Sequence, residues 1–257
     1  MNKYHTIIKA KISSYNLEDT KKIIHQWILD SQSKYVCVCN THSLVTSYKN
    51  TDFNLALQNA NLSIPDGMPL VWALKLYGVK DAERVDGPNL MQHLLMEGAK
   101  NKQYKIFLYG NTEECISDLK SVINTQYKGV QVVGSYSPPF RELEKREKQD
   151  VIDSINSTDA NLVFVSLGCP KQELWMYEMS GKIDATMIGV GAAFDFLTNR
   201  IKRPPLFFQK IGMEWFFRLL SEPRRLWKRY FYNNSMFLFL FFKTFLKNKD
   251  KGLNNEI

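Results

Sequence analysis

The residues best suited to chemistry lie in short polar stretches that follow apolar runs typical of buried strands. In one of them, NLVFVSLGCPKQELW at residues 161–175, the apolar run ends at Gly168, and Pro170 then suits the first turn of a helix. A helix that begins at the carboxyl end of a parallel strand presents free backbone N–H groups and a positive dipole end, which suit a phosphate. Gly168, Lys171 and Gln172 therefore predict an anion-binding corner. The segment alone leaves open an ordinary connection with a surface lysine.

Three further polar stretches follow strand-like runs in the same way. They are Asn40-Thr41-His42, Pro65-Asp66-Gly67 and Gly110-Asn111-Thr112. In a parallel sheet the loops at the carboxyl ends of the strands meet at one edge, which is the usual ligand site of such a fold. The sequence therefore predicts that all four polar stretches line one crevice.

Asp66 is the candidate general base. A carboxylate with an ordinary pKa near ~4 is ionised at neutral pH and can accept a proton from an attacking hydroxyl. Structural alternatives exist for each polar residue. Asp66 could close a turn, and Asn40 could cap a helix that begins near His42. His42 could donate a hydrogen bond within its loop, and Gln172 could tie its loop to neighbouring loops.

The sequence lacks the common motifs of cofactor and metal sites. The turn Gly189-Val190-Gly191 follows a strand-like run, but it has neither the GxGxxG spacing nor the acidic partner of a dinucleotide site. There is no Walker A motif, no Asp-x-Asp pair and no His/Cys cluster with ligand spacing. We therefore expect no cofactor and no dedicated metal site.

Charge is distributed unevenly along the 257 residues, whose formal net charge is +8. Residues 200–257 contain 13 Lys or Arg against 4 Asp or Glu, a net +9, whereas the rest contain 21 against 22, a net −1. A neutral body with a basic, aromatic tail indicates an anionic partner for the tail, such as a membrane surface, a diphosphate or nucleic acid. The apolar run Met236 to Phe242 would fit a nucleic-acid groove poorly, so we expect no nucleic acid.

The aromatic stretch from Tyr230 to Leu246 is expected to lie in a membrane interface. Asn233, Asn234 and Lys243 interrupt it, and its apolar run covers only 7 residues, too few to cross a bilayer. The N-terminus lacks the apolar stretch of a secretory signal. Cysteines occur without CxxC spacing, so we expect free thiols and a cytoplasmic protein, peripheral on the inner face of the cell membrane.

Strand-like and helix-like segments alternate along most of the chain. Strands are predicted at 6–12, 35–39, 62–64, 104–109, 130–136, 162–167 and 186–190. Helices are predicted at 17–29, 70–76, 90–99, 112–127, 141–155 and 170–179. This order predicts an α/β fold with a doubly wound, mostly parallel Rossmann-like sheet and helices on both faces. From the composition break near Asn199, we expect a core domain at residues 1–199 and a helical appendage at residues 200–257 that also completes the active site.

Together these stretches resemble the WecG/TagA/CpsF glycosyltransferases, family 26 of the sequence-based classification. The resemblance runs in order from about residue 5 to 232. It is carried by Asn40, Pro65-Asp66-Gly67-Met68-Pro69, Glu83-Arg84-Val85-x-Gly87-Pro88-Asn89-Leu90, Gly168-Cys169-Pro170-Lys171-Gln172-Glu173, the stretch from Gly189 to Asp195, and the tail stretch from Glu214 to Leu226.

The resemblance implies an inverting, metal-independent enzyme of surface polysaccharide or teichoic acid synthesis. Such an enzyme moves a sugar from a nucleotide donor, usually a UDP-sugar, to a polyprenyl-diphosphate-linked sugar at a membrane. The sugar would be an N-acetylhexosamine such as ManNAc, or a related hexose or uronic acid. Independently, an inverting transfer needs a base for the acceptor hydroxyl and positive groups for the departing diphosphate.

Carried over residue by residue, Asp66 matches the base, Asn40 and Gln172 match active-site polar residues, and Arg84 matches a site arginine. We expect Asp66, Asn40 and Arg84 to be catalytic. Substrate contacts are expected from Thr41, His42, Gly67, Gly110, Asn111, Gly168, Lys171, Gln172, Glu173, Arg218, Arg225 and Arg229.

Two positions depart from the family pattern. Val38 stands where the family commonly has Thr, and Asn89 stands where it commonly has Asp. The first change removes a hydroxyl from the site and bears on which sugar is transferred.

Three arginines of the tail are candidates for binding a diphosphate. Arg218 and Arg225 are seven positions apart, and Arg225 and Arg229 four, so a helix would place them along one face. The alternative is that they are solvated or contact lipid headgroups.

The main alternative function is a non-catalytic Rossmann-like module that binds a nucleotide-sugar at the membrane. Such a module would bind a UDP-sugar and show no turnover with any lipid acceptor. A homo-oligomer is compatible with the sequence, which does not decide the oligomeric state.

Overall fold

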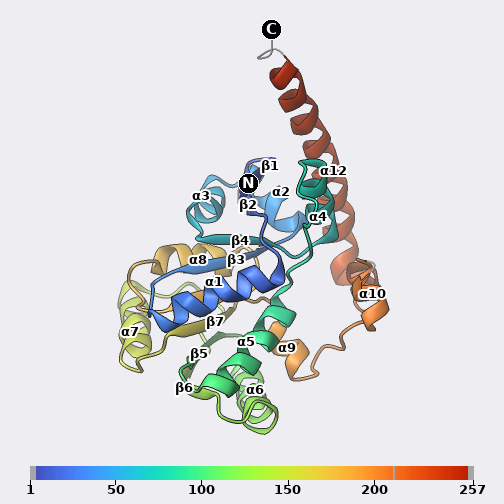
Figure 1. The fold of residues 1–257 in the computed structure, drawn as a ribbon. Coiled ribbons are helices and arrows are strands. Elements are labelled where there is room, and N and C mark those ends of the chain that lie inside the picture. Colours follow the sequence, from blue (N-terminus) through green and yellow to red (C-terminus); the bar gives the residue numbers. More distant parts are fainter. Residues whose placement is uncertain (1–3, 211, 254–257) are drawn as a thin grey trace.

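The centre of the fold is a parallel six-stranded sheet (Figure 1). The structure is a computed structural model that describes residues 4–210 and 212–253. The strand order is β4-β3-β8-β7-β5-β6, and every neighbouring pair is parallel, so all six carboxyl ends lie at one edge. This confirms the predicted α/β sheet. The strands are β3 (Tyr35–Cys39), β4 (Leu62–Pro65), β5 (Lys105–Gly110), β6 (Gln131–Tyr136), β7 (Leu162–Ser166) and β8 (Thr186–Gly189).

Side chains of the central strands alternate between two hydrophobic cores, one on each face of the sheet. Cys37 and Val163 belong to the first core, and Val36 and Phe164 to the second. The first core is covered by α2 (Thr41–Lys49), α3 (Thr51–Asn59), α4 (Met68–Leu76), α7 (Lys145–Asn156) and α8 (Lys171–Met179). The second is covered by α1 (Leu17–Leu29), α5 (Gly87–Asn101), α6 (Glu113–Gln126) and α9 (Ala193–Leu197).

The N-terminal segment forms a hairpin, so the prediction of one strand over residues 6–12 is wrong. β1 (Tyr4–Ile7) and β2 (Ala10–Ser13) pair antiparallel and turn at Ile8-Lys9. Ile8 has a φ of 62°, which is uncommon for a β-branched residue. Hairpin turns usually carry Asn or Gly at such positions, and without them the run looks continuous.

Side-chain caps start the helices that bring polar residues to the sheet edge. Asn40 caps α2, and its side chain accepts hydrogen bonds from the backbone of His42 and Ser43. This is the capping role that was the structural alternative for Asn40. Asn50 caps α3 in the same way. Most residues of α2, THSLVTSYK, have low helix propensity, so periodicity did not predict this helix, and only the capping alternative for Asn40 indicated it.

The C-terminal segment is helical, as predicted, and packs against the body (Figure 1). It contains α10 (Leu206–Lys210), α11 (Glu214–Ser221) and the 31-residue α12 (Pro223–Leu253). α12 lies against α2, and its C-terminal part projects beyond the body in Figure 1. Phe237, Leu240 and Phe241 are buried in the first core, and the Phe241 ring meets the ring of Tyr77, which follows α4, at 6.1 Å between centroids.

The opposite face of α12 is exposed and apolar. It presents Phe231, Leu238, Phe239, Phe242 and Leu246. Among the described residues, no helix has both the length and the apolar character needed to cross a membrane. α12 is therefore apolar on two faces, one packed on the body and one open.

If α12 is part of the core, Phe237→Ala should lower the free energy of unfolding by about 3–5 kcal/mol, because it removes a buried aromatic ring. Chemical denaturation measures this. Phe231→Ala is the matched control, since Phe231 is 74% exposed and its loss should change stability by no more than about 0.5 kcal/mol. Equal, small effects of both substitutions would show that α12 does not share the core.

Candidate active site

A cleft lies at the carboxyl edge of the sheet and has two adjoining lobes, which share lining residues. The large lobe has a volume of about 530 Å³ and is bordered by all four polar stretches predicted to meet, with Asn40, Asp66, Asn111 and Gly168 among its lining residues. The small lobe, of about 140 Å³, lies between the starts of α2 and α4 and the tail helices. The predicted crevice is therefore confirmed. The two lobes share Asn40, Asp66, Arg84, Glu214, Arg218 and Arg229.

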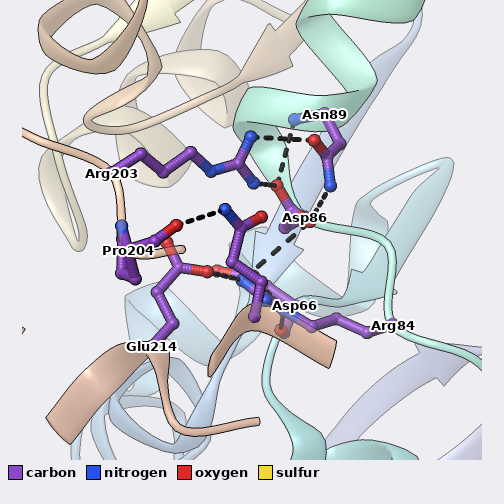
Figure 2. Close-up of polar contacts among 8 residues, drawn as sticks. Asp66, Arg84, Asp86, Asn89, Arg203, Pro204 and Glu214 are labelled. Atoms are coloured by element: carbon purple, nitrogen blue, oxygen red, sulfur yellow. Dashed lines mark hydrogen bonds and ion pairs between the residues drawn. The ribbon is translucent and has the colours of Figure 1, made fainter. Parts of the chain in front are cut away.

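Asp66 and Arg84, which line both lobes, are joined by hydrogen bonds (Figure 2). Asp66 directly follows β4, and its backbone N–H donates to the Cys39 carbonyl at 2.8 Å. Arg84 Nη2 donates to Asp66 Oδ1 at 3.0 Å and to Glu214 Oε2 at 2.8 Å, and Arg84 Nε also donates to the Asp66 backbone carbonyl. One guanidinium group thus holds a carboxylate of the body and one of the tail.

A second group of ion pairs fastens the segment before α10 to the start of α5. Asp86 caps α5 and accepts from the Asn89 backbone at 3.0 Å, and Arg203 donates to Asp86 at 2.8 Å and to Asn89 Oδ1 at 2.8 Å (Figure 2). Asn89 Nδ2 in turn donates to Asp86 Oδ2 at 2.7 Å. An amide at position 89 can both donate to Asp86 and accept from Arg203, which an ionised aspartate could not do.

The expectation of an ordinary pKa for Asp66 is wrong. Burial raises the pKa of Asp66 to about 6; the negative charges of Asp86 and Glu214 add to the rise, and Arg84 opposes it. The Asp66 side chain keeps 25% of its surface exposed, so it remains open to the cleft. Asp66 is therefore a stronger base than an ordinary carboxylate and is still mostly ionised above neutral pH.

Thr41 and His42 line the small lobe, where they meet the tail. Thr41 Oγ1 donates to Asn234 Oδ1 of α12 at 2.9 Å. Burial and the charge of Arg229 lower the pKa of His42 below its ordinary value, which favours a neutral ring at physiological pH. Asn40 borders both lobes, but its side-chain oxygen is committed to the cap of α2. Any contact of Asn40 with a ligand would therefore come from its NH₂ group.

Gln172, in the first turn of α8, lines the large lobe and ties this helix to the glycine turn at Gly191. Its Nε2 donates to Glu173 Oε1 at 3.0 Å, and its Oε1 accepts from the Gly191 backbone at 3.1 Å. Ser166 Oγ donates to the Gly191 carbonyl at 2.7 Å, so both the N–H and the carbonyl of Gly191 are hydrogen-bonded. The structural alternative predicted for Gln172 is thus present, and because Gln172 also lines the lobe, a contact with a donor substrate stays a prediction.

Three residues expected to bind substrate lie outside the lining of both lobes. Gly110 has a φ of +107°, and a Cβ there would lie 2.5 Å from the Ser166 carbonyl, so the close backbone approach accounts for the glycine. Lys171 is exposed at the start of α8. Glu173 is fully buried, and burial raises its pKa to about 7.

The remaining expected residues divide as follows. Gly67 lines the small lobe, and Arg218 and Arg229 line both. The side chain of Arg225 lies outside the described part of the structure.

Sequence reasoning missed Glu214, which lines both lobes, and the neighbouring ion pair of Asp86 and Arg203. Glu214 begins the tail stretch that carries the family resemblance, but nothing in the sequence pairs it with Arg84, which lies 130 positions away. In the part of the chain that the structure describes, no group of three or more His, Cys, Asp or Glu side chains is arranged to hold a metal ion.

Comparison with known proteins decides the family. The sequence model of the glycosyl transferase WecG/TagA/CpsF family matches residues 5–251. The chain belongs to this family of glycosyltransferases. A curated relative from Bacillus spizizenii (strain W23) is 28% identical over 200 residues, which cover 77% of this chain and 75% of the relative. That relative is an N-acetylglucosaminyldiphosphoundecaprenol N-acetyl-beta-D-mannosaminyltransferase. The cleft described above is thus the candidate active site of a glycosyltransferase.

Proposed function

We propose that this glycosyltransferase moves a sugar from a UDP-sugar to a polyprenyl-diphosphate-linked sugar, with inversion at the anomeric carbon and without a metal ion. The transferred sugar is an N-acetylhexosamine such as ManNAc, or a related hexose or uronic acid. The acceptor class is supported by the name of the Bacillus spizizenii relative, which acts on N-acetylglucosaminyldiphosphoundecaprenol. The β linkage in that name is the product expected when an α-linked donor reacts with inversion.

The observation that carries the proposal is the position of Asp66 between the two lobes. A transfer reaction needs one base that reaches the acceptor hydroxyl while the donor occupies an adjoining space. Asp66 lines both the large and the small lobe and is held by Arg84. We assign Asp66 as the general base, the large lobe to the nucleotide-sugar and the small lobe, which borders the tail, to the acceptor.

Positive side chains border both lobes and are proposed to meet the departing diphosphate. Arg218 and Arg229 line both lobes, and Gln172 and the loop before α8 border the large one. Guanidinium groups and helix N-termini stabilise negative charge that develops on phosphate oxygens. In this assignment the arginines of α11 and α12 neutralise the leaving nucleotide diphosphate.

The exposed face of α12 is proposed to hold the enzyme on an anionic membrane surface, at the cytoplasmic side where its nucleotide-sugar would be found. Phe231, Phe239 and Phe242 are exposed on this face, and Lys228 and Lys243 are exposed on the same helix. Apolar side chains in the interface and nearby basic residues both favour binding to anionic lipids. Such docking would bring the small lobe to a lipid-linked acceptor.

Asp66→Asn should reduce turnover by about 10²- to 10⁴-fold, because the amide cannot accept the acceptor's proton. Binding of UDP, measured by calorimetry, should be retained. Asp118→Asn is the control: Asp118 pairs with Arg200 on the surface, and its loss should leave turnover unchanged. Turnover by Asp66→Asn close to that of the wild type would exclude Asp66 as the base. UDP-sugar binding by the wild type without turnover on any lipid acceptor would favour the non-catalytic alternative.

The double substitution Phe231→Ser and Phe242→Ser should weaken sedimentation with anionic vesicles by roughly 10- to 100-fold, because two apolar side chains no longer enter the interface. Both residues are exposed, so the buried side chains of Phe237 and Leu240 keep α12 on the body. Leu55→Ser, on the exposed surface of α3, is the control and should not change sedimentation. Unchanged sedimentation of the double variant would show that this face of α12 does not bind lipid.

A further inference from the structure

Within the ion-paired group around Arg84, carboxylates outnumber guanidinium groups. Arg84 Nη2 lies 3.0 Å from Asp66, 2.8 Å from Glu214 and 3.9 Å from Asp86, and Asp86 in turn pairs with Arg203 at 2.8 Å. With all groups ionised, these three carboxylates and two guanidinium groups carry a net charge of −1. Glu214 is the one carboxylate of the three that comes from the tail, and its side chain is only 12% exposed.

We propose that Glu214 is a positioning residue for the transfer reaction: by binding Arg84 it divides that arginine's charge between two carboxylates and so keeps Asp66 a strong base. This inference rests on the proposed function in that Asp66 is taken as the base. The tail would then contribute to catalysis through a carboxylate, in addition to any role of its arginines. Asp66 would reach its full basicity only when α11 is docked.

The physical reason lies in how Arg84 distributes its hydrogen bonds. A guanidinium group that binds a single carboxylate stabilises the ionised carboxylate, which makes that carboxylate a weaker base. When a second carboxylate binds the same guanidinium group, this stabilisation is smaller, and the two negative charges also repel each other. Burial of Asp66 also raises the pKa of its carboxyl group, and the pKa of Asp66 lies above its ordinary value.

Other charged and titratable groups also face Asp66 and must be considered with Glu214. On the side of the tail they are Arg218, Arg229 and Tyr230, and on the side of the body they are Cys39, His42, Arg84 and Asp86. Among these, Arg84 is the group that hydrogen-bonds to both Asp66 and Glu214, so the effect of Glu214 on Asp66 is transmitted through Arg84 as well as directly.

Glu214→Gln tests the inference, because the amide oxygen can still accept from Arg84 while the negative charge is lost. We expect the titration midpoint of Asp66 to fall by about one pH unit, since Arg84 would then act mainly on Asp66. It can be followed by ¹³C NMR of the Asp66 carboxyl group, assigned by its loss in Asp66→Asn. The acid limb of kcat/KM against pH, measured with UDP-sugar and lipid-linked acceptor, should move down by the same amount.

Glu178→Gln is the charge-matched control, since Glu178 pairs with Lys148 on the surface, and it should move neither midpoint. A merely structural role for Glu214 predicts a loss of activity that is uniform across pH, with an unchanged Asp66 midpoint, and that result would overturn the inference. Absence of turnover in the wild type would instead overturn the proposed function, and the NMR titration would still decide the role of Glu214.

Discussion

The shared ion pairs of Arg84 join parts of the chain that the sheet alone does not bring together. Asp66 directly follows β4, Arg84 precedes α5, and Glu214 begins α11. A partly buried carboxylate left without its partner is costly, and Glu214 of the tail finds its partner in Arg84 of the body, so this contact stabilises the docked position of the tail. Arg203 repeats the connection by binding Asp86 and Asn89. The position of the tail and the charge state of the candidate base are therefore set by the same contacts.

The parallel sheet determines where this network can form. Its six strands deliver their loops to one edge, and β4 is an edge strand with β3 as its sheet neighbour. Asp66 consequently lies at the border of the sheet, where α2, α4 and the tail helices meet. The large lobe opens over the central strands, and the small lobe lies under the tail. The strand order and the docked tail together place Asp66 at the boundary between the two lobes, where a base for a transfer between two substrates would be needed.

Features that depend on neighbouring residues in the sequence could be predicted, whereas contacts between residues far apart in the sequence could not. Alternating and continuous apolar runs predicted the strands of the sheet, and polar residues after those strands predicted the cleft around Asn40 and Asp66. The hairpin turn at Ile8 carries no turn residue, and the pair of Arg84 and Glu214 spans 130 positions, so neither leaves a local pattern. Because α12 is apolar on two faces, composition could not show that Phe237 is buried against the body while Phe231 is exposed.

The most direct test of the account is to offer the purified protein a panel of UDP-sugars with a short-chain prenyl-diphosphate-GlcNAc acceptor and to identify products by mass. If Asp66 accepts the proton of an acceptor hydroxyl beside a bound nucleotide-sugar, one donor should add a single sugar to the acceptor, with UDP released in equal amount. That product should form in the presence of EDTA. Binding of UDP-sugars without any extended acceptor, across the whole panel, would contradict the account and leave a nucleotide-sugar-binding module.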